Sequence, residues 1–333
     1  MRLHCAAGLG GARGTFASSP PAVPERLMGI YLLRRIYQAA LVFLVLSGIV
    51  FAILHISGDP VALLMPADAT PDQMTEMRTA LGLDKPLWMQ YGIFLKNAIQ
   101  GNLGVSYHHG QPALKLVLER LPASLELVVA TILISLILAV PIGVLAASKR
   151  GSAVDRASLL GSLIGISAPP FWIGIAFILI FSVELQWLPS SGRGTWAHLV
   201  LPATSLALYR LALFIRLIRA GMLDILTMDF IRTARSKGVS ERMVIYKHAL
   251  KNTLIPFVTI AGMQMGSLLA GAIVTEKVFA WPGMGRLFLD AIGVMDFPVI
   301  IAWALVTATI FLAVNFAVDV IYVWLDPRIR HEK

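Results

Sequence analysis

The side chains best placed to do chemistry lie in one basic segment, residues 229–256, between two hydrophobic stretches. It reads DFIRTARSKGVSERMVIYKHALKNTLIP. We expect Asp229 to cap a short helix that Gly238 ends in a left-handed conformation, and Ser240 to cap a second helix that runs to Pro256. Its cations, beside the small Ala234, suit the binding of a soluble partner. A basic loop resting on anionic lipid head groups is the alternative.

Other kinds of chemistry have little support in the sequence. No GxxxxGK[ST] phosphate loop is present, so the chain is not expected to bind and hydrolyse ATP by itself. The one cysteine, Cys5, excludes an intramolecular disulfide. His108 and His109 are adjacent but isolated, and no Cys/His cluster has metal-ligand spacing. An enzyme or a membrane-bound scaffold would need clustered catalytic groups or a large soluble domain, and neither is visible.

The elements around the basic segment are those of a membrane protein. Hydrophobic residues make up 57% of the chain and charged residues 14%, whereas soluble domains are about 25% charged. The formal net charge of +9 comes from Lys and Arg at the ends of hydrophobic stretches. This placement favours a role in membrane topology and argues against nucleic acid as a partner.

We predict an all-α membrane protein with six transmembrane helices, since each span needs about 20 largely apolar residues. Lys and Arg gather in alternate loops, which places both termini and the basic segment in the cytoplasm. A long outer segment, about residues 57–122, is expected to hold a helix over 70–81, begun by Thr70 and Pro71 and ended by Gly82, and another over 86–98. The predicted spans are about 31–55, 124–147, 157–183, 196–218, 255–275 and 299–325, and Pro202 and Arg210 are expected to interrupt the fourth.

Several residues inside the spans are candidates for pathway or packing roles. Pro169 and Pro170 predict a kink in the third span, which either is filled by neighbouring helices or shapes a pathway. Gln264 and Asn315, like Asp319, are expected to face the bundle interior or a partner helix, where structural hydrogen bonding is the simpler role. Gly262 and Gly266 have the GxxxG spacing of closely packed helices.

The spans carry no ladder of carboxylates, although a proton-coupled carrier usually needs titratable groups near the midplane. A carrier or channel that works without nucleotide is therefore the alternative function. Residues 1–27, rich in Gly, Ala, Ser and Pro, are interpreted as a disordered tail or a mis-assigned start. Residues 28–333 are expected to form a single transmembrane domain.

Motifs along nearly the whole chain resemble those of one family. TARSKG (233–238) and NTLIP (252–256) resemble the EAA motif of ABC importer permeases of the dipeptide/oligopeptide (or glutathione) branch, with Thr233 where the motif's name has Glu. The other matching motifs, in chain order, are YLLRRI, SGDP, LGLDKPLWMQY, GNLGVSY, LPASLEL, VLAASKRGSAVDR, EKVFAWPGMGRL and LDPRIR.

This resemblance implies a type I ABC importer (MetI-like) permease fold and a non-catalytic subunit of a bacterial inner membrane transporter. It implies four kinds of partner: membrane lipid, a second permease subunit that completes a heterodimeric pore, two ABC ATPase subunits that bind the ATP and Mg, and an extracytoplasmic substrate-binding protein. No cofactor is expected on this chain. The substrate would be a dipeptide, an oligopeptide or a related solute such as glutathione or nickel.

The resemblance also implies a cytoplasmic loop, about residues 220–256, whose coupling helix docks on an ATPase. Residues 232–238 match the coupling helix best. The residues assigned to this loop are Asp229, Arg232, Thr233, Ala234, Arg235, Lys237, Gly238, His248, Asn252 and Pro256.

Overall fold

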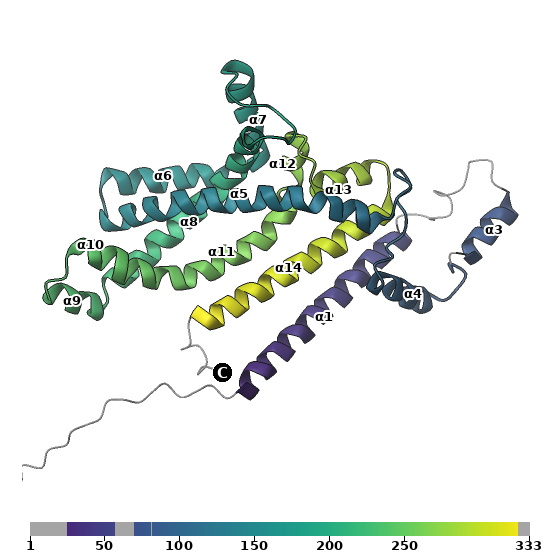
Figure 1. The fold of residues 1–333 in the computed structure, drawn as a ribbon, viewed down its shortest axis with the longest axis horizontal. Coiled ribbons are helices and arrows are strands. Elements are labelled where there is room, and N and C mark those ends of the chain that lie inside the picture. Colours follow the sequence, from purple (N-terminus) through teal and green to yellow (C-terminus); the bar gives the residue numbers. More distant parts are fainter. Residues whose placement is uncertain (1–24, 57–69, 81, 326–333) are drawn as a thin grey trace, which may run out of the picture. The chain divides into compact units, whose positions relative to one another are not determined.

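The computed structural model describes residues 25–56, 70–80 and 82–325. Within these ranges the chain is helical, and its β structure is limited to an isolated bridge between Val105 and Pro112. The chain divides into two units, residues 1–42 and 43–333. The first unit holds the described start of α1 (Glu25–Ile56), and the second holds the other helices of the described ranges (Figure 1). Residues 1–24 of the tail predicted for residues 1–27 lie outside the described residues.

Four helices in the described ranges are long and apolar enough to cross a membrane, and a sharply bent pair would make a fifth. The four are α5 (Ala113–Ser148), α8 (Trp196–Leu226), the continuous helix Glu241–Gly271, and residues 297–318 of α14 (Phe297–Leu325). The predicted first span falls on α1, where the described apolar part is Ala40–Ala52. The all-α membrane architecture is confirmed, and the count of six spans stays a prediction.

The short helices predicted in the outer segment are present as α3 (Pro71–Ala80) and α4 (Leu87–Ile99). Thr70 and Gln73 hold the start of α3 reciprocally, because each backbone N–H donates to the other side chain, at 3.0 and 3.4 Å. The second predicted span falls on α5, which begins at Ala113, eleven residues before the predicted start at 124, and accommodates Pro122.

The central helix of the second unit is α8, which packs against α5, α6 (Ala153–Ser167), α7 (Pro170–Phe177) and α11 (Lys251–Gly271). Close approach to α5 depends on Gly143, since a Cβ there would lie 2.9 Å from Ile218. The fourth predicted span was expected to be interrupted by Pro202 and Arg210. It is instead one helix of 31 residues that ends at Leu226.

The third predicted span is broken rather than kinked. Helix α6 ends at Ser167, and α7 with its π-helical continuation η1 (Ile178–Glu184) leaves it at 99°. The physical reason is the Pro169–Pro170 pair, because a residue before proline is pushed out of the α region, and Ala168 is extended at φ −93°, ψ 127°. Pro170 then starts α7 as its first residue, where a missing N–H costs nothing.

The last part of the chain returns along the central helix. Helix α10 (Glu241–Met243), the π-helical turn η2 (Val244–Leu250) and α11 form one continuous helix, so the prediction that Pro256 ends it was wrong. Proline removes only one internal hydrogen bond there, and packing against α8 and α14 holds the helix together. The short helices α12 (Ile273–Val278) and α13 (Met284–Gly293) lead into α14.

The GxxxG spacing of α11 has a clear structural role. A Cβ at Gly262 would overlap Val318 of α14, and one at Gly266 would lie 2.7 Å from the Phe311 ring. Both glycines therefore allow α11 and α14 to approach closely, as the small-residue spacing predicted.

Candidate functional site

The basic segment forms a helix, a tight turn and the start of the continuous helix 241–271, at one end of the layer made by α5, α8 and α11 (Figure 1). Helix α9 (Asp229–Ser236) follows α8 after only Thr227 and Met228. Its anchor is Ile231, which is fully buried in the largest hydrophobic cluster together with Met222 of α8 and Val244 of η2. This packing ties α9 to the central helix.

The start of α9 differs from the prediction in one detail. Met228, not Asp229, occupies the capping position, and no side chain caps the helix. The Asp229 side chain is 95% exposed and lies 3.7 Å from Arg232, one turn further along the helix. Asp229 still places a negative charge in the first turn, where the helix dipole favours it.

The outer face of α9 is polar and basic. Arg232 is 81% exposed at its side chain, and Thr233, Arg235, Ser236 and Lys237 are also exposed. Ala234 is half-buried and packs against the hydrophobic cluster beneath the helix. The helix is thus amphipathic over two turns, with a buried isoleucine on one side and several cations presented on the other.

The turn after α9 is fixed by a glycine and an ion pair. Gly238 has φ +75°, as predicted, and its surroundings leave open space where a Cβ would stand. Arg235 spans the turn to Glu241 through two hydrogen bonds, Nε to Oε2 at 3.1 Å and Nη2 to Oε1 at 2.7 Å. Ser240 precedes the next helix without a side-chain cap, contrary to expectation. The turn therefore presents α9 in one defined orientation.

The remaining residues predicted for this loop lie elsewhere along the continuous helix. His248 is half-buried, and its carbonyl accepts a hydrogen bond from Asn252 Nδ2 at 2.6 Å. Pro256 is fifteen residues beyond Glu241, a helical rise of about 22 Å. The structure thus gathers residues 229–238 at one surface, whereas these three follow the helix away from it.

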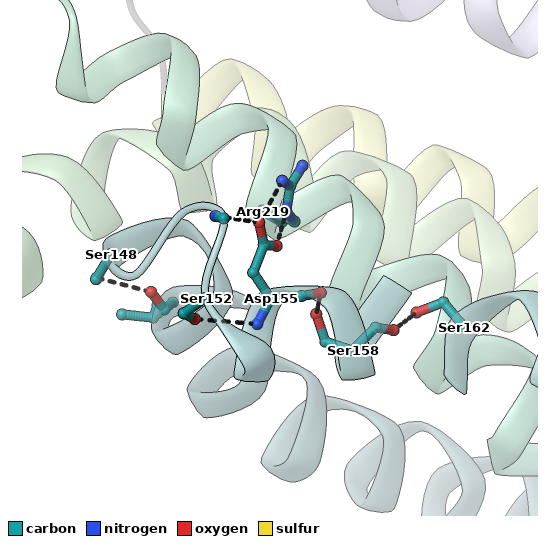
Figure 2. Close-up of polar contacts among 8 residues, drawn as sticks. Ser148, Ser152, Asp155, Ser158, Ser162 and Arg219 are labelled. Carbon is teal, nitrogen blue, oxygen red and sulfur yellow. Dashed lines mark hydrogen bonds and ion pairs between the residues drawn. The ribbon is translucent and has the colours of Figure 1, made fainter. Parts of the chain in front are cut away.

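The sequence analysis missed an ion pair that holds the neighbouring turn (Figure 2). Asp155, at the start of α6, is 4% exposed and binds Arg219 of α8 through both carboxylate oxygens, at 2.5 and 2.9 Å. The Gly151 N–H also donates to Asp155, at 2.9 Å. The one sequence signal was Ser152 three residues before Asp155, a capping pattern that the structure shows, since Ser152 Oγ accepts from the Asp155 N–H.

The candidate pathway residues occupy different places. Pro169 is exposed at the break, and Pro170 is half-buried. Gln264 faces the neighbouring helix α8, where Arg210 donates a hydrogen bond to its Oε1. Asn315 is half-buried on α14. Groups of His, Cys, Asp and Glu suited to a metal ion are absent from the part of the chain that the structure describes.

Comparison with known proteins identifies the family. Residues 139–331, more than half of the chain, match the family model of the binding-protein-dependent transport system inner membrane component, and residues 28–128 match that of its N-terminal region. The chain belongs to this family of permeases. It is therefore a membrane subunit of a transport system rather than an enzyme, as predicted.

Curated relatives agree over most of the permease. A dipeptide transport system permease of Alkalihalophilus pseudofirmus is 37% identical over 90% of this chain and 99% of its own length. A glutathione transport system permease of Escherichia coli K12 is 39% identical over 91% of this chain and 99% of its own length. The resemblance to the dipeptide and glutathione branch is thereby confirmed.

Solved structures support the fold. Two chains from inward-facing crystal forms of the MetNI methionine ABC transporter superpose with TM-scores of 0.51 and 0.54. Each is 18% identical, and the match covers 65% of the permease and 98% of the solved chain. The MetI-like fold predicted from the sequence is confirmed on this basis.

Proposed function

We propose that the permease forms half of the translocation pore of an ATP-driven importer and that α9 is the helix through which ATPase subunits drive it. The observation that carries the proposal is the construction of α9. Its outer face is exposed and basic, its inner face is anchored by the buried Ile231, and it follows the central helix α8 almost directly. An ATPase that grips α9 would pull on the middle of the bundle.

The electrostatics of α9 favour a protein groove with acidic character. Among the described residues, Asp229 is the carboxylate that pairs with Arg232, no ion pair of Lys237 is found, and Asp229 is itself almost fully exposed. Phe230 and Met228, 42% and 48% exposed, add apolar surface beside these cations. Such a mixture suits a protein groove that offers both an apolar floor and an acidic rim.

The complete transporter would contain a second permease subunit, two ATPase subunits that bind ATP and Mg, and an extracytoplasmic binding protein. The permease would lie in the inner membrane with both termini and α9 on the cytoplasmic side. Its substrate would be a dipeptide or a related solute such as glutathione, since its relatives are dipeptide and glutathione transport permeases. ATP binding can drive transport only if the ATPase contacts α9 differently in the two states of the pore.

Co-purification tests the proposal. The permease is expressed with the candidate partner subunits, extracted in mild detergent and captured, and the recovered subunits are identified by mass spectrometry. The double variant Arg232→Ala/Arg235→Ala should recover less ATPase, while recovery of the second permease stays unchanged. Arg156→Ala is the matched control, because Arg156 is an exposed arginine of α6 outside the basic segment.

The competing function is a carrier or channel that works without nucleotide. Uptake driven by an ion gradient into liposomes that contain this chain alone would establish it. Equal ATPase recovery from wild type and the double variant would leave the importer possible but would remove α9 as its coupling helix.

A further inference from the structure

Arg210 places a positive charge near the middle of a membrane-crossing helix. It is fourteen residues from the start of α8 and sixteen from its end, so about 20 Å of helix lies on each side. Charged side chains at such depth face the interior of a bundle or a water-filled cavity rather than lipid, and they frequently mark a substrate pathway.

The partners of Arg210 are neutral. Its Nη1 donates to Gln264 Oε1, and its Nη2 lies 3.4 Å from Ser267 Oγ, both on α11. The guanidinium carbon lies 5.2 Å from the Tyr209 ring centre. Within residues 25–56, 70–80 and 82–325, no carboxylate forms an ion pair with Arg210. Arg219, nine residues further along α8, has such a carboxylate in Asp155.

The surroundings of the guanidinium are open and lined by small residues. Arg210 and Gln264 are half-buried, and Ser267, Ala270 and Gly271 are exposed. A Cβ at Gly271 would have Arg210 Nη2 as its nearest neighbour, at 4.0 Å. This polar, small-residue face, on the last two turns of α11, is poorly suited to lipid tails.

We propose that Arg210 and Gln264 form a binding site for a carboxylate of the transported solute, inside the translocation pathway. An arginine has five N–H donors in a planar fork that matches a carboxylate, and the neutral partners here leave its charge uncompensated. Gln264 accepts from Arg210 through its oxygen, so its amide N–H groups remain to donate to the same carboxylate. Peptides and glutathione carry such a carboxylate, and in this respect the inference rests on the proposed function.

A charge series at one position tests the site. The complete transporter is reconstituted in liposomes with its binding protein, and uptake of dialanine is measured beside the ATP hydrolysis that the binding protein stimulates. Arg210→Gln should lower uptake about tenfold, the loss of one strong charge-assisted contact. Arg210→Lys should lose less and Arg210→Glu more, while stimulated hydrolysis stays near the wild-type rate. Arg216→Gln, which removes an exposed cation from the same helix, should leave uptake unchanged.

Three results would overturn the inference. One is wild-type uptake by Arg210→Gln. Another is an equal loss in Arg210→Gln and Arg216→Gln, which would mean that α8 needs charge in general. The third is loss of the second permease from the purified Arg210→Gln complex, which would show that Arg210 pairs with that subunit instead. A wild-type complex that neither hydrolyses ATP nor takes up dialanine would contradict the proposed function itself. In that case, direct binding of radiolabelled dialanine to wild type and to Arg210→Gln would decide whether Arg210 binds a carboxylate.

Discussion

Arg219 and Asp155 join the central helix α8 to the turn between α5 and α6, through two hydrogen bonds of 2.5 and 2.9 Å. The pair is seven residues before the end of α8, close to where the chain passes into α9. Asp155 also accepts from the Gly151 N–H, so one carboxylate fixes the turn, the start of α6 and α8 at once (Figure 2). The Arg219–Asp155 ion pair therefore fixes the end of α8, from which α9 follows, against the start of α6.

Removing this carboxylate should destabilise the protein markedly. Asp155→Ala leaves the Arg219 charge, which is 19% exposed, and the Gly151 N–H without their partner. Breaking a buried ion pair in this way costs about 3–5 kcal/mol. We expect a large fall in the melting temperature of the detergent-purified protein. Asp224→Ala, which removes an exposed carboxylate from the same end of α8, is the control and should change stability by less than about 0.5 kcal/mol. Similar melting curves for the two variants would contradict the role of the pair.

The anchor of α9 provides a second prediction. Ile231→Ala removes a fully buried side chain from the main hydrophobic cluster, a change that typically costs about 2–5 kcal/mol. Because α9 is only two turns long, we expect it to detach locally while the membrane helices remain folded. Protease cleavage within residues 229–240 should therefore become faster. The exposed Thr233 is the comparison, and Thr233→Ala should be cleaved at the wild-type rate. Equal protection of both variants would mean that Ile231 does not hold the helix.

The turn after α9 favours glycine at position 238 because of its backbone conformation, not because a side chain there would clash. Its φ of +75° is unfavourable for a β-branched residue, and no heavy atom lies within 4 Å of a Cβ built there. Gly238→Val should thus cost about 1–2 kcal/mol, with rearrangement of the turn and weaker ATPase recovery. Asn tolerates the left-handed region, so Gly238→Asn should recover the ATPase at nearly the wild-type level. If both variants bind the ATPase equally well, the geometry of this turn does not set the docking of α9.

Local sequence signals predicted individual helices and turns, whereas contacts between residues far apart in the chain could not be predicted from them. Thr70 and Pro71 predicted the start of α3, and Gly238 predicted the turn, because both are decided by neighbouring residues. Pro256 was misread, since tertiary packing carries the helix through it. The Arg219–Asp155 pair joins residues 64 positions apart, and no spacing rule connects them. Arg210 was noticed only as an interruption, because its partners lie on another helix.

A buried carboxylate outside the membrane-crossing helices gives a prediction about pH. Glu276 of α12 is 1% exposed and accepts hydrogen bonds from Ser124 Oγ at 2.6 Å and from the Arg286 N–H at 2.9 Å. Burial raises its pKa above the ordinary value of 4.5, and the hydrogen bonds oppose this only in part. Above pH 4.5 the unfolded chain therefore loses a proton that the folded protein keeps. The contribution of Glu276 to stability consequently falls as the pH rises from 4.5 toward the pKa of Glu276 in the folded protein.

Glu276→Gln removes this titration. The melting temperature of the wild type relative to Glu276→Gln should therefore fall as the pH rises above about 4.5, as followed by fluorimetry in detergent. Glu119→Gln, a change at an exposed carboxylate of α5, should show no such trend relative to the wild type. A difference between wild type and Glu276→Gln that is constant across the pH range would contradict the raised pKa.

Close packing between α11 and α14 can be separated from helix propensity by matched glycine substitutions. Gly262→Ala puts a methyl group where Val318 stands, and overpacking of this kind costs about 1–3 kcal/mol. Gly92 of α4 has no heavy atom within 4 Å of a Cβ built on it, so Gly92→Ala should stabilise its helix by about 0.5–1 kcal/mol. Val318→Ala in the Gly262→Ala background should restore part of the lost stability, because it removes the two Val318 atoms that lie nearest to the new methyl group. Additive losses in the double variant would show that the two residues do not touch, and that α11 and α14 pack through another face.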